Sequence, residues 1–208
     1  LVVVPMLLTT AYHATQDVPA FALATQKAYP QARVTMASPI GADPHLLRGM
    51  DTVLKAAGHR PNPETAVVLA SAGSSFAPAR ARHAALAMQW RSHGWGASAV
   101  AFASGPGPTV TEAVSELRET GVDEVCVAPF LIAPGVMSQR IAASAPFVAQ
   151  AVEQGRHRVR VHIGQVWRLA IEQAKAQQAR AGSHCLLVLG HRDLERSSDD
   201  SRPCRCPH

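Results

Sequence analysis

Short apolar runs alternate with helix-like segments along the whole chain. Runs typical of strands lie at 1–4, 32–38, 66–71, 97–103, 123–129, 158–163 and 184–189. Helical patterns lie between them, at about 16–28, 44–57, 77–92, 109–120, 138–153 and 165–181. This alternation predicts βαβ units, parallel sheets covered by helices and therefore the α/β fold class. Right-handed crossovers put every loop that follows a strand at one edge of the sheet, where open α/β sheets bind their ligands.

The alternation contains an internal repeat. The strand VVVP (2–5) resembles VCVAP (125–129), and VTMASPIG (34–41) resembles VRVHIG (159–164). The elements between these pairs agree in kind and order, so we expect two similar parallel-sheet βα domains.

The repeat also predicts domain limits. Residues 1–58 correspond to the C-terminal half of a first domain, 59–65 (HRPNPET) to a linker, 66–190 to a second domain and 191–208 to a disordered tail. Because the second copy carries two strand–helix units that have no counterpart before Leu1, we expect the first domain to be incomplete at its N-terminus. The alternative is a half-domain completed by another chain or by the C-terminal strand CLLVLG (185–190), since a two-stranded sheet exposes unpaired edges.

Composition limits the class of function. The chain has 208 residues, is 47% hydrophobic and 17% charged, and has a net charge of +5, as in a packed globular protein that favours anionic partners. Its basic residues are scattered and aromatic residues make up only 5%, so nucleic-acid binding is disfavoured. No apolar run reaches the length of a membrane span, and we expect no membrane partner.

The four cysteines do not indicate a disulfide framework. Cys126 and Cys185 lie in predicted strands and are typical of small buried residues. Cys204 and Cys206 lie in the tail SRPCRCPH, whose spacing is not a standard zinc pattern. A reducing cytoplasm is therefore the expected compartment.

The segment that follows the first strand carries the most distinctive chemistry. LVVVPMLLTTAYHATQDV (1–18) places His13 in a loop at the predicted ligand edge, with Asp17 four residues further on. An imidazole there can transfer protons or bind a metal near neutral pH. A surface histidine beside a helix N-terminal charge is the simpler interpretation. In the second copy, Val136 or Met137 replaces the histidine and Arg140 the aspartate.

Two loops of the second domain are further candidates. Gly73, Ser74 and Ser75 follow the strand 66–71, where serine hydroxyls and helix N–H groups can bind a carboxylate or phosphate; an ordinary helix cap is the alternative. Arg80 and Arg82 could assist. Pro134 and Gly135 form a turn that could line a cleft.

The remaining histidines show no metal-binding spacing and are interpreted as surface or strand-capping residues. They are His45, His59, His83, His93, His157 and His162, while His191 follows the last predicted strand in an irregular motif.

Five stretches, in this order, resemble the sirohydrochlorin chelatases, class II tetrapyrrole chelatases that insert cobalt or ferrous iron. The resemblance covers roughly residues 1–170 and rests on PMLLTTAYHATQDVP, PIGADPHLL, the strand–AGSS–helix unit, AFASGPGPTVTEAV and VAPFLIAPGVMSQRI.

The resemblance implies two α/β domains around a cleft, with histidines near its floor that take protons or hold metal. His13 matches the second family histidine and Asp17 the acidic residue four positions on, so both are expected to be catalytic and His13 to contact the metal. Gly73 and Ser74 match the Gly-Ser of the first-strand loop, where Ala72 replaces the other histidine. Substrate contacts are expected from Thr10, Tyr12, Gly73, Ser74, Ser75, Pro134 and Gly135.

The implied function is insertion of Co²⁺ or Fe²⁺ into sirohydrochlorin, in sirohaem or cobalamin biosynthesis. The ion is a substrate, and no permanently bound cofactor is expected. The expected partners are the tetrapyrrole and the divalent ion, and a homodimer is left open. One alternative is a catalytically degenerate protein that binds a tetrapyrrole or metal. Another is a periplasmic-type or sugar-nucleotide-binding protein, which the lack of a glycine fingerprint disfavours.

Overall fold

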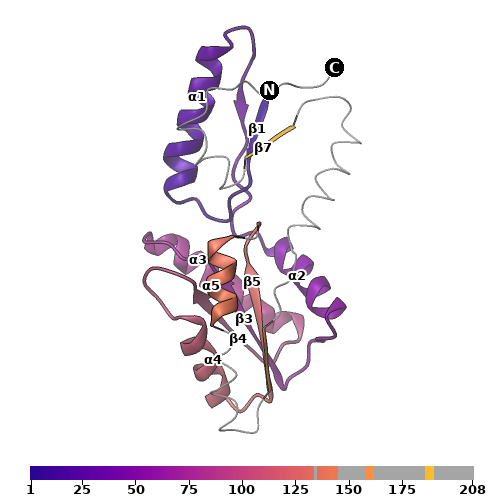
Figure 1. Cartoon of the computed structure of the whole chain (residues 1–208). Helices are drawn as coiled ribbons and strands as arrows, with labels where there is room; N and C mark the ends of the chain where they lie inside the picture. The colour runs from indigo at the N-terminus through magenta and orange to yellow at the C-terminus, as the bar shows by residue number, and fades with distance from the viewer. Residues whose placement is uncertain (134, 145–157, 162–185, 190–208) are drawn as a thin grey trace. The chain divides into compact units, whose positions relative to one another are not determined.

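The computed structural model describes residues 1–133, 135–144, 158–161 and 186–189 (Figure 1). The chain divides into two compact units: unit 1 contains Leu1–Gly41 together with β7, and unit 2 runs from Ala42 through β6. The predicted α/β fold class is confirmed, because both units are built on parallel sheets.

Unit 1 is built on a three-stranded sheet in the order β2-β1-β7. Its elements are β1 (Val2–Pro5), the π-helical turn η1 (His13–Asp17), α1 (Val18–Ala28), β2 (Thr35–Met36) and β7 (Leu186–Leu189). β7 pairs in parallel with the whole of β1, from Val2↔Leu186 to Pro5↔Leu189. The pairing agrees with the alternative stated in the sequence analysis, in which the C-terminal strand (185–190) completes the sheet of the first domain.

Unit 2 is built on a four-stranded parallel sheet in the order β4-β3-β5-β6. Its strands are β3 (Thr65–Ser71), β4 (Ala97–Phe102), β5 (Glu124–Phe130) and β6 (Arg158–Val161). Its helices are α2 (Pro44–Ala56), α3 (Ala77–Met88) with the 3₁₀ turn η2 (Gln89–His93), α4 (Val110–Glu119) and α5 (Val136–Ala143). The helix predicted at 165–181 lies outside the described residues.

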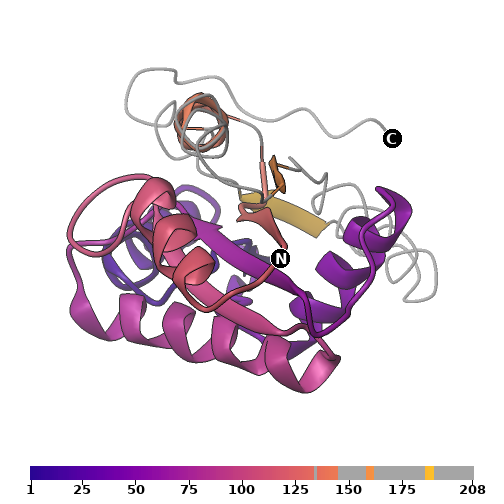
Figure 2. The ribbon, with the colours of Figure 1, turned by 90° about the horizontal axis from the view of Figure 1, so that it is seen from below.

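Helices cover both faces of the unit 2 sheet. On one face, Val114 and Leu117 of α4 and Ile141 of α5 pack with alternate residues of β3 and β5, such as Val68 and Val127. On the other face, His83 of α3 contacts Ser71 and Phe130 at the ends of the same two strands. Figure 2 shows the sheet between α3 and α4. Since both faces are covered, all seven residues of β3 are buried.

A buried carboxylate fixes α2 to unit 2. Leu47, Met50, Asp51 and Leu54 recur at helical spacing and are buried. Asp51 Oδ1 accepts hydrogen bonds from the indole N–H groups of Trp90 and Trp95, each at 3.0 Å, and Asp51 Oδ2 lies 2.6 Å from His93 Nδ1. Three groups from the segment between α3 and β4 thus converge on one α2 side chain. These contacts explain why α2 belongs to unit 2. The domain limits 1–58 and 66–190, which describe the repeat, stay a prediction.

We predict that Asp51→Ala lowers the free energy of unfolding by about 3 kcal/mol or more, because it leaves two buried indole N–H groups without their acceptor. Urea denaturation followed by tryptophan fluorescence and circular dichroism measures the change.

Asp43→Ala is the matched control, since Asp43 caps the exposed start of the same helix by accepting from the His45 backbone N–H at 2.7 Å. Its loss should cost only about 1 kcal/mol. That backbone hydrogen bond, with the His45 ring beside it, lowers the pKa of Asp43. The cap therefore stabilises the fold above the ordinary aspartate pKa and loses its effect as pH falls through the lowered pKa. An equal loss in both variants would contradict the role given to Asp51.

Candidate functional site

His13 and Asp17 form a hydrogen-bonded pair just beyond the carboxyl end of β1. His13 Nδ1 lies 2.5 Å from Asp17 Oδ2, and the two side chains are 46% and 35% exposed. The exposure leaves the pair within reach of a ligand. The structure thus brings together the two residues that the sequence singled out as catalytic.

The backbone of this segment explains the pairing. The helix was expected to begin near residue 16, but helical structure begins at His13 with the π-turn η1, whose Val18 N–H donates to the carbonyl of His13. Pro19, in the first turn of α1, has no N–H to donate, so the regular α-helical ladder can begin only after the wider turn. π-Turns of this kind occur frequently at functional sites.

A cluster of buried apolar residues in the described part of unit 1 anchors the pair. Val18, next to Asp17, is fully buried against Val3 of β1, and Leu7, Phe21 and Val34 pack around them. Thr15 Oγ1 donates to the carbonyls of Ala11 and Tyr12, each at 3.3 Å, which closes the start of the turn. Apolar contacts of Val18 with β1 therefore stabilise the C-terminal side of the turn that carries His13, and hydrogen bonds of Thr15 stabilise its N-terminal side.

The two other candidates in this segment lie close to the pair in sequence. Tyr12 is 68% exposed, and its ring lies edge-on to the His13 imidazole with the centroids 6.1 Å apart. Thr10 is half-buried in the loop before η1. Tyr12 therefore offers an exposed aromatic surface beside the imidazole.

In unit 2, the loop after β3 is tightly built. Gly73 has a φ of +94°, and a Cβ atom added there would lie 1.9 Å from the carbonyl oxygen of Ser104, in the loop after β4. Ser104 Oγ donates to the carbonyl of Ala72 at 2.8 Å. The glycine matched to the family Gly-Ser thus has a packing reason to be glycine.

Ser74, Ser75 and Arg80 define the shape of that loop. Ser74 Oγ accepts from the Phe76 N–H at 3.1 Å and so closes a turn before the helix. The N-cap of α3 is Phe76 and no side chain caps it, so the ordinary serine helix cap given as the alternative is not formed. Arg80 donates from Nη1 to the carbonyls of Ser74 (2.7 Å) and Ser75 (2.9 Å), which places a guanidinium in the loop. Ser75 is exposed. The loop therefore combines a positive charge with an exposed serine.

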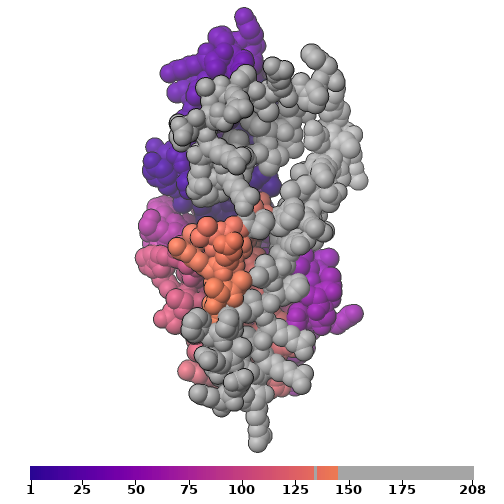
Figure 3. Space-filling model, in the orientation of Figure 1, coloured from indigo at the N-terminus to yellow at the C-terminus, as the bar shows by residue number. Residues whose placement is uncertain are grey.

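The loop after β5 is more open. Gly135 has extended backbone (φ 175°), and a Cβ atom there would meet nothing within 4 Å. Its N–H donates to Ser138 Oγ at 2.8 Å, and Val136, the first residue of α5, is 61% exposed. Figure 3 shows α5 in orange at the surface. Pro134 lies outside the described residues. Packing against the described residues of unit 2 does not require a glycine at position 135.

β1 of unit 1 and β5 of unit 2 are the matching strands of the repeat, and the helical structure after each begins at matching positions. It begins at His13 after β1 and at Val136 after β5. Arg140, at the position of the aspartate, is exposed. The imidazole–carboxylate pair of unit 1 therefore has no equivalent at this position of unit 2.

Three histidines are not the surface or capping residues that the sequence suggested. His59, His83 and His93 are buried or largely buried, and their partners are Glu124, Ser71 and Asp51. Sequence spacing could not reveal the pairs of His59 and His93, because each of these histidines is more than 40 positions from its partner in the chain. His45 is exposed, as expected, and lies 2.8 Å from Asp43 Oδ1. His157, His162 and His191 lie outside the described residues.

Gly73 and Gly135 differ in how closely their surroundings are packed. We predict that Gly73→Ala lowers the free energy of unfolding by at least about 2 kcal/mol, because it adds a steric clash to an unfavourable positive φ. Gly135→Ala should change it by no more than about 0.5 kcal/mol. Urea denaturation of both variants tests this, and a large loss for Gly135→Ala would contradict the open environment described above.

Comparisons with known proteins agree with this architecture. The model of the CbiX family matches residues 1–57 and 66–180. A structure of SirB from Bacillus subtilis with Fe³⁺ superposes with a TM-score of 0.66 at 24% identity, covering 86% of this chain and 72% of that one. The sirohydrochlorin chelatase SirB from Bacillus subtilis subspecies spizizenii in complex with cobalt gives a TM-score of 0.56 at 21% identity, covering 87% and 71%.

A search of curated proteins found no significant match. Among the described residues, no helix combines the length and apolar character needed to cross a membrane. The family model covers most of the chain, and the resemblance seen in the sequence is confirmed: the chain belongs to the CbiX family.

Proposed function

We propose that this protein inserts a divalent metal ion, Co²⁺ or Fe²⁺, into sirohydrochlorin, with His13 as the group that accepts protons and contacts the metal. The observation that carries the proposal is the His13–Asp17 pair, found in a member of the CbiX family at the carboxyl end of a parallel strand. SirB, with the same fold, is a sirohydrochlorin chelatase and is described with cobalt and with Fe³⁺.

The chemistry of metal insertion suits such a pair. As the ion binds the four nitrogens of the macrocycle, two pyrrole N–H protons leave and pass to a base and then to solvent, so the reaction needs a proton acceptor close to the ion. When Asp17 holds the proton on Nδ1 of His13, the lone pair of the imidazole lies on Nε2. This nitrogen can take up a pyrrole proton or bind the incoming ion for a short time. The ion is a substrate, and the proposal needs no resident cofactor.

The charge of the protein suits the macrocycle. Sirohydrochlorin carries several carboxylates, and the net charge of +5 favours an anionic ligand. In unit 2, Arg80 of α3 reaches back to the loop that carries the exposed Ser75, and both groups can donate to carboxylates. We assign Ser74, Ser75, Gly73 and Gly135, together with Thr10 and Tyr12, to substrate binding as part of this proposal.

The donor types do not select the metal. Imidazole and carboxylate ligands accept both Fe²⁺ and Co²⁺, and Co²⁺ binds such ligands more tightly in the general order of affinities. The choice between sirohaem and cobalamin synthesis therefore depends on the supply of the ion as well as on the site. Metal insertion should therefore be assayed with both Co²⁺ and Fe²⁺.

We predict that His13→Ala lowers the rate of enzyme-dependent metal insertion at least 100-fold, because the proton acceptor is lost. Asp17→Asn should lower it about 10- to 100-fold, because the imidazole loses the carboxylate that orients it. Absorbance of sirohydrochlorin, recorded under anaerobic conditions after Co²⁺ or Fe²⁺ is added, measures the rate above that of spontaneous insertion.

His45→Ala is the matched control, because His45 also pairs with an aspartate but lies on the exposed start of α2. Its rate should equal that of the unmodified chain. Unchanged turnover in His13→Ala would contradict the proposal. If the unmodified chain shifts the tetrapyrrole spectrum but adds no metal-dependent change, the degenerate binding protein is the correct alternative. The observation that favours it is that Val136 and Arg140 stand at the positions of unit 2 that match His13 and Asp17.

A further inference from the structure

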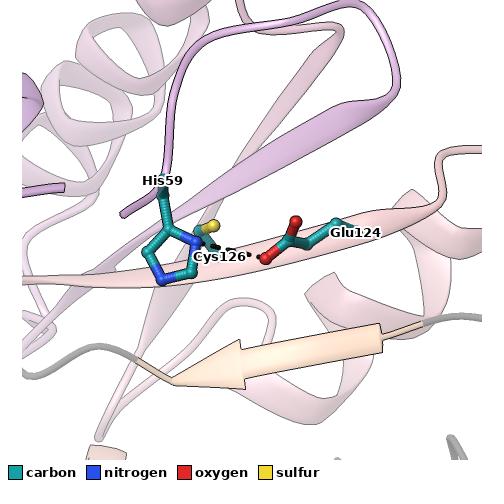
Figure 4. A group of neighbouring side chains, drawn as sticks. All are labelled: His59, Glu124 and Cys126. Carbon is teal, nitrogen blue, oxygen red and sulfur yellow. Dashed lines mark ion pairs between the residues drawn. The ribbon is translucent and has the colours of Figure 1, made fainter. Parts of the chain in front are cut away.

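Three side chains that commonly bind metals meet at the amino end of β5 in unit 2. His59 Nδ1 lies 3.1 Å from Glu124 Oε1, and the ligand atoms of His59, Glu124 and Cys126 all lie within 4.8 Å of one another. Figure 4 shows the imidazole and the carboxylate directed toward each other, with the thiol beside them. The metal-insertion chemistry proposed above uses none of these three residues.

A helix-ending turn and a strand position the three side chains. Gly58, with a φ of +89°, ends α2 in the left-handed region, and the His59 N–H donates back to the carbonyl of Leu54 at 2.9 Å. Glu124 and Cys126 are two residues apart on β5, so their side chains project from the same face of the strand. The turn that ends α2 and one face of β5 thus bring the three side chains together.

Burial and donor type favour a bound cation. The His59 side chain is 5% exposed and Cys126 is fully buried, whereas the Glu124 side chain is 27% exposed. We propose that His59, Glu124 and Cys126 form a binding site for a divalent cation of the Zn²⁺ class, with water as the fourth ligand on the side of Glu124.

The dimensions suit such an ion. With zinc–ligand bonds of about 2.0–2.3 Å, the ligand atoms of a tetrahedral site lie about 3.4–3.8 Å apart. The three donors already lie within 4.8 Å of one another, so shifts of about 1 Å complete the geometry. A nitrogen, an oxygen and a sulfur donor suit Zn²⁺ and Co²⁺. Binding deprotonates the Cys126 thiol and releases that proton to solvent.

The site is separate from the loops proposed to bind substrate in the same unit. β3 and β5 run in parallel from Thr65↔Glu124 to Ser71↔Phe130. The cluster lies at the start of β5, whereas the loops that carry Gly73 and Gly135 follow the ends of β3 and β5, about 20 Å away at about 3.3 Å per residue. An ion at the cluster joins the end of α2 to β5, so its expected effect is on stability.

Titration of the metal-free chain with Co²⁺ tests the site, because a cobalt–thiolate bond gives a charge-transfer band in the near ultraviolet. We expect the band in the unmodified chain and its loss in Cys126→Ser. Zn²⁺ should raise the melting temperature of the unmodified chain, and at a free concentration 100 times Kd the stabilisation amounts to about 2.7 kcal/mol. Both Cys126→Ser and the more exposed Glu124→Gln should lose most of this rise.

Two controls make the result decisive. Cys204→Ser/Cys206→Ser removes the thiols of the C-terminal segment and should keep the band, whereas a band that disappears there and persists in Cys126→Ser would overturn the proposal. His13→Ala should keep both the band and the Zn²⁺-dependent rise, which separates this site from the proposed catalytic residue. If Zn²⁺ raises the melting temperatures of Glu124→Gln and the unmodified chain equally, the cluster is not a metal site.

Discussion

Unit 2 depends on the burial of β3 between two parallel neighbours. All seven of its residues are buried, and it pairs along its length with β4 on one side and β5 on the other. A parallel strand in this position needs helices on both faces, because neither face can be left to water. The same pairing brings the loops after β3 and β4 to one edge, where Gly73 packs against the backbone of Ser104.

In the described part of unit 1, a small cluster of buried residues holds a helix against a parallel strand. The contact between Val3 and Val18 holds the start of α1 against β1, and Asp17 is the residue next to Val18. The π-turn before Pro19 then brings His13 to the carboxylate. The position of the pair therefore depends on a few buried side chains and one proline, which makes its geometry sensitive to changes well outside the imidazole.

The same chemical pair, histidine beside a carboxylate, occurs in four environments in the described part of the chain. His45–Asp43 is exposed and caps a helix, whereas in His93–Asp51 the carboxylate also accepts from two buried indoles and fixes α2. His59–Glu124 lies beside a buried thiol, and His13–Asp17 is half-exposed at the end of β1. Burial and neighbouring groups, and not the pair itself, separate a cap, a structural link, a proposed metal site and a proposed catalytic site.

The amino-acid sequence by itself determined the order of strands and helices, because apolar period and turn residues are local signals. It also indicated His13 and Asp17, whose four-residue spacing lies within one helical turn. It left open whether the C-terminal strand completes the first sheet, which the pairing of β7 with β1 answers. It did not predict the packing of α2 through Asp51 or the cluster of His59 with Glu124 and Cys126, because these join segments with no shared local pattern. Only the tertiary structure decided these, because side-chain burial and strand pairing depend on which distant surfaces pack together.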